Sequence, residues 1–443
     1  MKLNRYHLLL LLLWIFCACS SGKKTPPAES SGNTQKLPSQ PATDYTPLIP
    51  SIVHLESFDG ERFLNSETAF FVDSNLLACR LNPLQNASRA RISPWNEDRN
   101  FTVAGFVAVD RINGLVLLQA EGIKRKPVHL YTTPVQAGTK CLYLTRPRGN
   151  TLPLHRGMLS GPATLKGSLR YLLTNRFRSQ SYGTPVFTTP DRCIGLGYAE
   201  PVDYEQQHQA IPASLISELL SRKTSRPEPL QNLGSRTSKA ISETNSKISG
   251  LEIVTDMGTI RIRLFNQTPQ YRDNFIALVR EQYYDSLLIH RVIRDFGIQS
   301  GAADTRYAGK DDVVGWKGPG YTLPAHPVPG LFHRRGMIGS PRKPDRANSK
   351  RRSDGSQFYI VTGRRYTDAE LDEIEQENQY RFSAKQRQIY KSEGGAPHLD
   401  GSYTVFGEVL SGMETADRIS RIKVDSDFRP LQDIRIRHIR ILP

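Results

Sequence analysis

Two stretches that are poor in large apolar residues divide this 443-residue chain and limit what it can fold into. One runs from Ser20 to about Gln40 and the other from about Arg222 to Ser249. Such segments bury too little apolar surface to offset the entropy lost on ordering, so we expect them to be connectors. The predicted organisation is a tether at 19–44, a first domain at 45–221, a linker at 222–248 and a second domain at 249–443.

The chain opens with Lys2 and Arg5, followed by the apolar run 8–16. This charge and length predict a secretory signal peptide at 1–18, because the run is too short for a membrane span. The residues around Cys19 resemble the lipobox of bacterial lipoproteins, in which a small residue precedes a cysteine that is cleaved and lipidated. The resemblance implies a lipid anchor on Cys19 and a place in the cell envelope, at the outer membrane and facing the periplasm. The alternative is a secreted protein without lipid.

Cysteine content and charge exclude some classes of site. The body of the chain holds Cys79, Cys141 and Cys193, which allow at most one internal disulfide and which we interpret as packing residues. Without a CxxC pair or a histidine cluster at ligand spacing, we expect no structural metal. A net charge of +16 favours acidic polypeptides or anionic head groups, or serves solubility. Because the basic residues do not alternate with aromatic ones in a strip, we expect no nucleic acid partner.

The first domain is predicted to be all-β, because short apolar runs alternate with turn-rich stretches. These runs lie at 51–55, 69–72, 106–109, 115–118 and 141–144. Only 213–220 has a helical pattern. The order of these pieces resembles the chymotrypsin-fold, trypsin-like serine proteases of the Deg/HtrA group. That resemblance implies a chymotrypsin-like double β-barrel.

The catalytic residues of that protease family are missing from their places. Leu81 stands where the histidine belongs, Gly114 where the aspartate belongs, and Tyr182 where the serine belongs. Neither leucine nor glycine can act as a base or orient one, so we expect no protease activity. The remaining readings are a peptide-binding or structural pseudoprotease and an unrelated β-barrel. The candidates for a shifted triad, which have no positional support, are His54, His155 and Ser181.

The second domain opens with an alternating hairpin, 251–254 and 259–264. Thr268 and Pro269 then form the pattern of a helix start, with Thr268 as the predicted cap. Tyr271, Phe275, Leu278 and Val279 form the apolar stripe of this predicted helix.

Three ordered motifs follow in the second domain. Residues 289–301 read Ile-His-Arg-Val-Ile-Arg-Asp-Phe-Gly-Ile-Gln-Ser-Gly, residues 355–360 read Gly-Ser-Gln-Phe-Tyr-Ile, and residues 399–407 read Leu-Asp-Gly-Ser-Tyr-Thr-Val-Phe-Gly. In this order they resemble cyclophilin-type peptidyl-prolyl cis/trans isomerases over residues 249–443. The resemblance implies a cyclophilin-like eight-stranded β-barrel with capping helices, so the whole chain is expected to be mainly β.

The implied chemistry needs no nucleophile, metal or cofactor. Rotation about an amide bond costs about 18 to 20 kcal/mol because C–N resonance is lost. A site that lowers this barrier needs an apolar pocket for the proline ring and a donor aimed at the prolyl nitrogen as it becomes pyramidal. By resemblance Arg291 is that donor and Gln299 holds the peptide, although by pattern alone Arg291 could be a surface arginine. The implied substrate-binding residues are Phe296, Pro341, Gln357, Tyr359, His398, Leu399 and Tyr403.

The sequence departs from the cyclophilin pattern around the pocket. Gly297 replaces a methionine, His398 a frequent tryptophan and Tyr403 a frequent histidine, while Pro341 and Arg342 replace an Ala-Asn pair. We expect retained isomerase activity on proline-containing polypeptides, with altered preference. The rival hypothesis is a non-catalytic chaperone or scaffold in which both domains hold peptides.

An insertion lies between the second and third motifs, and its capping-box pattern at 367–370 predicts a solvated surface helix.

Overall fold

The computed structural model describes residues 43–147, 149–165, 167–202, 205–234 and 239–442. The predicted signal peptide and Cys19 lie outside these residues. Within them, no helix is long and apolar enough to cross a bilayer.

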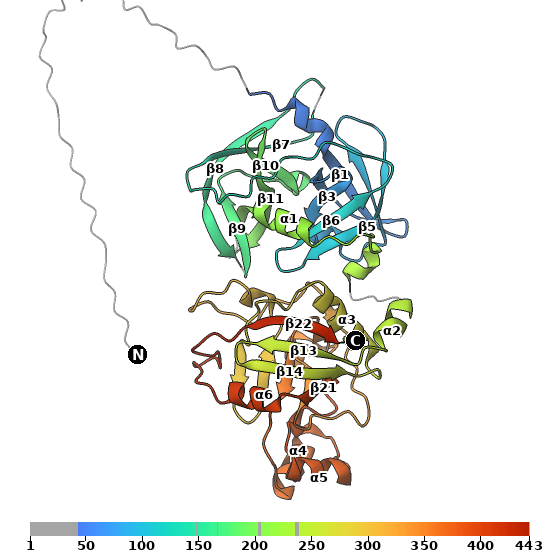
Figure 1. Ribbon diagram of the computed structural model, residues 1–443, viewed down its shortest axis with the longest axis vertical. Coiled ribbons are helices and arrows are strands. Elements are labelled where there is room, and N and C mark those ends of the chain that lie inside the picture. The colour runs from blue at the N-terminus through green and yellow to red at the C-terminus, as the bar shows by residue number, and fades with distance from the viewer. Residues whose placement is uncertain (1–42, 148, 166, 203–204, 235–238, 443) are drawn as a thin grey trace, which may run out of the picture. The chain divides into compact units, whose positions relative to one another are not determined.

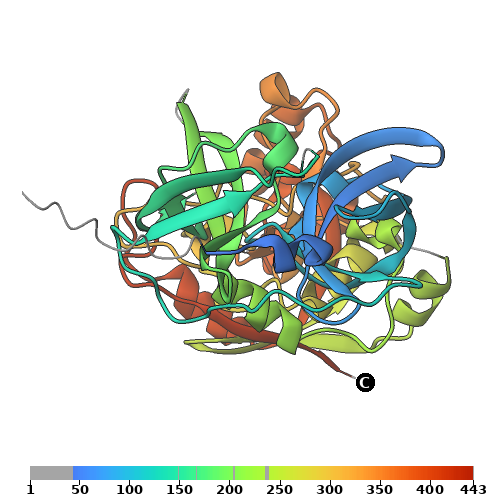
Figure 2. The same cartoon turned by 90° about the horizontal axis from the view of Figure 1, so that it is seen from above.

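Two closed antiparallel barrels lie side by side and form the barrel domain, residues 52–221 (Figure 2). The first barrel consists of β1 (Ile52–Asp59), β2 (Arg62–Phe71), β3 (Leu76–Arg80), β4 (Arg89–Pro94), β5 (Phe101–Asp110) and β6 (Leu115–Ala120), in the order β1-β2-β3-β6-β5-β4. The second consists of β7 (Lys140–Leu144), β8 (Leu154–Leu165), β9 (Ser168–Leu173), β10 (Thr184–Thr189), β11 (Arg192–Val202) and β12 (Glu205–Pro212), in the order β10-β11-β12-β9-β8-β7. The predicted double barrel is confirmed.

The apolar runs of the sequence become the inner strands of these barrels. Every residue of β3 is buried, as is every residue of β6 except Gln119, so neither strand alternates between buried and exposed positions. The three described cysteines are buried and free, which agrees with packing roles. Helix α1 (Ala213–Ser221) follows β12, at the position where the sequence shows a helical pattern.

The segment 222–248 is more ordered than its composition predicts. It contains the 3₁₀ turn Leu230–Leu233, whose two leucines are buried in the core of the first barrel, and helix α2 (Lys239–Asn245). The backbone of Glu228 exchanges two hydrogen bonds with Phe106 of β5. A polar connector therefore docks through two apolar anchors, which a composition average does not reveal.

The C-terminal domain, residues 250–442, is built on one eight-stranded sheet in the order β15-β16-β20-β18-β21-β14-β13-β22. Its strands are β13 (Gly250–Thr255), β14 (Gly258–Leu264), β15 (Arg291–Ile293), β16 (Gly297–Ser300), β18 (Met337–Ser340), β20 (Phe358–Val361), β21 (Thr404–Ser411) and β22 (Ile436–Leu442). A separate ribbon pairs β17 (Thr322–Leu323) with β19 (Ser353–Asp354). Backbone bonds from Ser286 to Ile436 and from Ile289 to Ile434 join the two ends of the curled sheet. The predicted eight-stranded fold is confirmed.

Helices cover this sheet as predicted, with one difference at a cap. Helix α3 (Pro269–Arg280) begins with Pro269 and buries the predicted stripe, and α6 (Met413–Ser420) follows β21. Thr268 occupies the N-cap position of α3 but does not cap it with its side chain. Its hydroxyl instead donates to the carbonyl of Phe265 at 3.3 Å, and this competing local bond explains why the predicted cap is wrong.

The insertion forms two helices, α4 (Asp368–Asn378) and α5 (Ala384–Ser392), which project as a pair in Figure 1. Each begins with a capping box, at Thr367 and at Ser383, so the predicted box at 367–370 is confirmed. The pair has its own apolar cluster, formed by Phe332, Leu371, Phe382 and Tyr390. This buried cluster makes the insertion more than a solvated surface helix.

Candidate active site

One row of residues crosses three strands of the C-terminal sheet. Arg291 on β15 lies opposite Gln299 on β16, and Gln299 lies opposite Tyr359 on β20. Directly opposed residues of antiparallel strands point to the same face, so the three side chains form a row. Arg291 is exposed at the end of this row, and its guanidinium carbon lies 5.6 Å from the centroid of the Phe428 ring.

An apolar cluster borders the row. The Phe296 ring, in the turn between β15 and β16, has its centroid 5.8 Å from that of Tyr359 and 5.6 Å from that of His398. Leu399 and Tyr359 are buried, while Phe296 and Tyr403 are partly exposed. The other buried members of the cluster are Met337, Val361, Ala396 and Val405. Partly exposed aromatic rings over a buried apolar base can receive a proline ring.

A buried polar chain lies behind this cluster. The hydroxyl of Tyr359 lies 2.9 Å from Nε2 of His333, and Nδ1 of His333 lies 2.8 Å from Oδ1 of Asp400. Tyr390 of α5 donates its hydroxyl hydrogen to Oδ2 of Asp400 at 2.6 Å. Burial holds the pKa of Tyr359 well above its usual value, so this side chain remains neutral. The insertion thus contributes to the support of the pocket wall.

The amides of Gln299 and Gln357 are bonded to each other beside the row. Nε2 of Gln299 donates to Oε1 of Gln357 at 2.9 Å, and Nε2 of Gln357 donates to the carbonyl of Gly315 at 3.1 Å. His290 is buried nearby, and this burial lowers its pKa to about 4, so its ring is uncharged at neutral pH.

Two glycines allow close approaches in the wall of the pocket. A Cβ at Gly297 would lie 2.6 Å from the carbonyl oxygen of Ile360, so the close approach of β16 and β20 leaves no room for a side chain. A Cβ at Gly339 would lie 2.3 Å from the Tyr359 hydroxyl oxygen. The hydroxyl of Tyr359 therefore occupies the space that Gly339 leaves open.

At the rim, the Arg342 guanidinium carbon lies 4.6 Å from the centroid of the Tyr403 ring. Pro341 follows the end of β18, and its carbonyl accepts a hydrogen bond from the Asp354 backbone N–H at 2.9 Å. Pro341 is linked to the row through the chain, because Gly339, two residues earlier, lies opposite Tyr359.

The structure thus places the predicted residues around one face of the sheet, with Pro341 at its margin. Sequence reasoning missed Phe428, His333 and Tyr390. The one residue of this buried hydrogen-bonded chain that the sequence motifs contain is Asp400, in the third motif, and the sequence assigned it no role. A lone histidine such as His333 offers no spacing from which its partners could be inferred.

In the barrel domain, the three places of the lost triad lie around a buried ion pair. The Leu81 backbone N–H donates to the Gly114 carbonyl at 2.8 Å, so these two places are adjacent. The Tyr182 ring centroid lies 5.2 Å from the guanidinium carbon of Arg80, which pairs with the buried Glu67. None of the three places holds a serine, a histidine or an aspartate.

The shifted triad is contradicted in its geometry. The Ser181 hydroxyl donates to the Arg178 carbonyl at 2.8 Å, within its own turn. The ring of His155 stacks on Tyr143, with centroids 4.6 Å apart, and His54 lies on β1 beside Glu56. No group of three or more His, Cys, Asp or Glu side chains in the described part of the chain is arranged to hold a metal ion.

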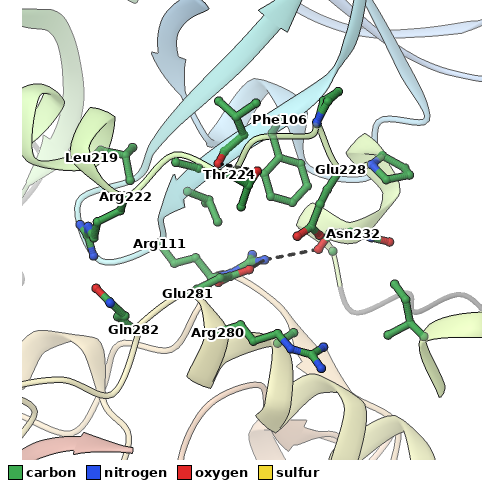
Figure 3. A pocket seen from close by; sticks show the side chains of 18 of the residues that line it. Phe106, Arg111, Leu219, Arg222, Thr224, Glu228, Asn232, Arg280, Glu281 and Gln282 are labelled. Carbon is green, nitrogen blue, oxygen red and sulfur yellow. Dashed lines mark hydrogen bonds and ion pairs between the residues drawn. The ribbon is translucent and has the colours of Figure 1, made fainter. Parts of the chain in front are cut away.

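A cavity of about 740 Å³ lies outside the row. It is lined by residues of β5, the 222–234 segment and α3, including Phe106, Arg222 and Arg280 (Figure 3). None of the predicted site residues lines it.

Comparisons with known proteins agree with this arrangement. A family model described as cyclophilin type peptidyl-prolyl cis-trans isomerase/CLD matches residues 250–441. Peptidyl-prolyl cis-trans isomerase-like 3 of Gallus gallus is 32% identical over 190 residues, which are 42% of this chain and 92% of that protein. A putative peptidyl-prolyl cis-trans isomerase of Staphylococcus aureus is 30% identical over 189 residues, 42% of this chain and 88% of that protein.

Solved structures resemble each domain in turn. A cyclophilin type isomerase of Cryptosporidium parvum, solved in the presence of the dipeptide Ala-Pro, is 24% identical and covers 44% of this chain and 99% of its own, with a TM-score of 0.32. A Mycobacterium tuberculosis protease in its active form is 15% identical and covers 41% of this chain and 84% of its own, with a TM-score of 0.36. Strand order, rather than these scores, supports the double-barrel assignment.

Proposed function

Because the chain belongs, through residues 250–441, to the cyclophilin-type peptidyl-prolyl cis-trans isomerase family, we propose that it isomerises X–Pro bonds in unfolded or folding polypeptides of the bacterial cell envelope. The observation that carries this proposal is the row of Arg291, Gln299 and Tyr359 across β15, β16 and β20.

Each residue of the row has a distinct task in this proposal. The proline ring binds against Phe296 and Tyr359, where apolar contact excludes water. The Gln299 amide bonds the peptide backbone. Arg291 donates to the prolyl nitrogen only when that nitrogen becomes pyramidal, so it binds the twisted amide more tightly than either planar form. The exposed position of Arg291 leaves its guanidinium free to reach the peptide from solvent.

The test is a proline-isomer exchange assay on the full chain, with Arg291→Ala as the variant. We expect kcat/KM to fall by about 100-fold, the typical cost of removing one transition-state donor. Arg294→Ala, an exposed arginine three residues away, is the matched control and should keep wild-type activity. A wild-type protein no faster than the uncatalysed reaction would refute the proposal.

A second candidate, a non-catalytic chaperone, is supported by the altered rim. Gly297 has no side chain to form a wall of the pocket, and the Arg342 guanidinium lies over the Tyr403 ring. Both features favour binding of a peptide over isomerisation of its X–Pro bond. Suppression of client aggregation that Arg291→Ala leaves unchanged, in a protein without exchange activity, would select this function.

For location we propose that lipid on Cys19 anchors the protein to the outer membrane, facing the periplasm. The support is the basic start, the apolar run and the small residue before Cys19. Produced in a bacterium with two membranes, the wild type should fractionate with the outer membrane and carry the mass of a lipidated N-terminus. Cys19→Ser should be released in soluble form, whereas Cys17→Ser, the neighbouring control, should remain anchored. An unlipidated wild type would contradict the proposal.

A further inference from the structure

The place of the lost protease triad is walled by the C-terminal domain. Leu81 and Gly114, at two of the three triad places, line a cavity of about 400 Å³. Residues 316–320 of the C-terminal domain line the same cavity. The contact is close, since a Cβ at Gly320 would lie 2.8 Å from Nε2 of Gln85. Residues of the C-terminal domain therefore form part of the wall at the place of the lost triad.

In the opposite direction, the turn between β5 and β6 enters the C-terminal domain. Ile112 at its tip is 1% exposed and belongs to the apolar core of that domain. The neighbouring Arg111 pairs with Glu281, with Nε 2.5 Å from Oε2 and Nη2 2.9 Å from Oε1 (Figure 3). Arg111 also donates to the carbonyl of Leu233 at 2.6 Å. Buried contacts on both sides of this turn therefore join the two domains.

The segment that meets this turn is the bridging loop, residues 304–320. Within it, Nζ of Lys317 donates to the carbonyl of Ile112 at 3.0 Å and to the hydroxyl of Ser168 at 2.5 Å. Ser168 begins β9 and donates to the same Ile112 carbonyl at 2.5 Å. One ammonium group is thus held by two strand connections of the barrel domain.

The other groups of the bridging loop fix its backbone. The buried carboxylate of Asp304 accepts hydrogen bonds from three consecutive backbone N–H groups, those of Gly315, Trp316 and Lys317, at 2.9 to 3.2 Å. Gly167 of the β8–β9 turn lies against Asp304, because a Cβ there would be 1.9 Å from Cα of Asp304. Lys317 and Asp304 thereby place the carbonyl of Gly315.

That carbonyl reaches the candidate active site. Gly315 accepts a hydrogen bond from Gln357, which in turn accepts one from Gln299. Gln299 lies opposite Arg291 in the row. A continuous series of hydrogen bonds therefore runs from the barrel domain through the bridging loop to Gln299, the residue assigned to bind the peptide.

We propose that the barrel domain is a scaffold for the isomerase site, and that Lys317 is a positioning residue that holds Gln299 in register with Arg291 through the bridging loop. This inference rests on the proposed isomerase function. It assigns the former protease cleft to internal support instead of client binding.

The electrostatics of Lys317 agree with a positioning role. Burial and the nearby charge of Arg170 lower its pKa to about 8, against the opposing effect of Glu200, Asp304 and Asp110. A lysine with a lowered pKa costs folding free energy at neutral pH, because the folded state disfavours its charge. Stability alone therefore does not account for a lysine at this place.

The test compares full-length Lys317→Met and Ser168→Ala with wild type, each on one X–Pro peptide series with kcat and KM determined separately. We expect Lys317→Met to lower kcat by about tenfold with KM nearly unchanged, as for a displaced positioning group. Ser168→Ala, although in the other domain, should lower kcat in the same direction. The double variant should be no slower than Lys317→Met, because both changes remove the same Lys317–Ser168 hydrogen bond. Lys310→Met, an exposed lysine in the same loop, is the control and should change neither constant.

A second measurement does not depend on catalysis. Hydrogen exchange of the full chain should be faster in Lys317→Met both in the bridging loop and in β16, and unchanged in Lys310→Met. An active wild type with unchanged kcat in Lys317→Met, or exchange that rises in the loop but not in β16, overturns this inference alone. An inactive wild type overturns the proposed function, and the exchange in β16 then still decides whether the barrel domain supports that strand.

Discussion

At the scale of single residues, Tyr359 combines two roles in the site. Its ring forms the pocket wall beside Phe296, and its hydroxyl reaches His333 and fills the space above Gly339. A phenylalanine would supply the same ring but would leave a nitrogen of the buried His333 without its partner, at a cost of about 1 to 3 kcal/mol. The hydroxyl therefore fixes the ring position through a polar contact.

His290 should make the protein acid-sensitive. Its pKa is lowered to about 4 by burial, with Arg291 and Arg429 acting in the same direction. Above pH 6.5 the ring is neutral in both states and there is no penalty. As pH falls from 6.5 to 4, the unfolded chain binds a proton that the folded protein cannot, so the free energy of unfolding drops by about 3 kcal/mol.

Chemical denaturation at several pH values checks this expectation. His290→Gln should lose less stability over this pH interval than wild type does, whereas His129→Gln, an exposed histidine, should follow the wild-type curve. Parallel curves for wild type and His290→Gln would contradict the assignment.

At the scale of elements, the strands and helices that bury apolar stripes could be predicted from sequence, because pattern and burial have one cause. The row of the active site followed from motif resemblance. Contacts between distant segments could not be predicted, because no local periodicity marks them. Leu230 packs in the core of the first barrel, and Arg111 pairs with Glu281. The Thr268 cap failed for a similar reason, since its hydroxyl had an alternative acceptor.

The α4 helix offers a test of the insertion. Thr367→Ala removes the side-chain acceptor for the Glu370 N–H and half of the capping box, which should destabilise the helix by about 1 kcal/mol. Amide exchange at Leu371, measured by NMR, should become faster. Ser392→Ala, at the last turn of α5, is the control and should leave α4 unchanged. Equal exchange in wild type and Thr367→Ala would show that packing alone holds the helix.

At the scale of the whole molecule, the two domains share buried groups. Arg111 is almost fully buried and Glu281 is 15% exposed at the side chain, so the pair is shielded from solvent. Removing one partner of such a pair leaves the other charge poorly solvated. The domains should therefore unfold as one unit in the wild type.

Arg111→Met should uncouple them. We expect a loss of about 3 kcal/mol and a calorimetric profile that changes from one transition to two. The control is Arg280→Met, which replaces an exposed arginine of α3 that lines the same cavity as Arg111 (Figure 3). This variant should retain the single transition. A single, unshifted transition in Arg111→Met would show that the pair does not couple the domains.

The burial of Ile112 in the neighbouring domain bears on how the chain is made. During synthesis the barrel domain leaves the ribosome first, and domains fold in that order. Its β5–β6 turn then presents an isoleucine to water until residues 250–442 have been translated. A nascent chain stalled before that point exposes an apolar side chain that is buried in the complete protein. A truncated product released at this stage should therefore present an apolar surface to quality-control chaperones.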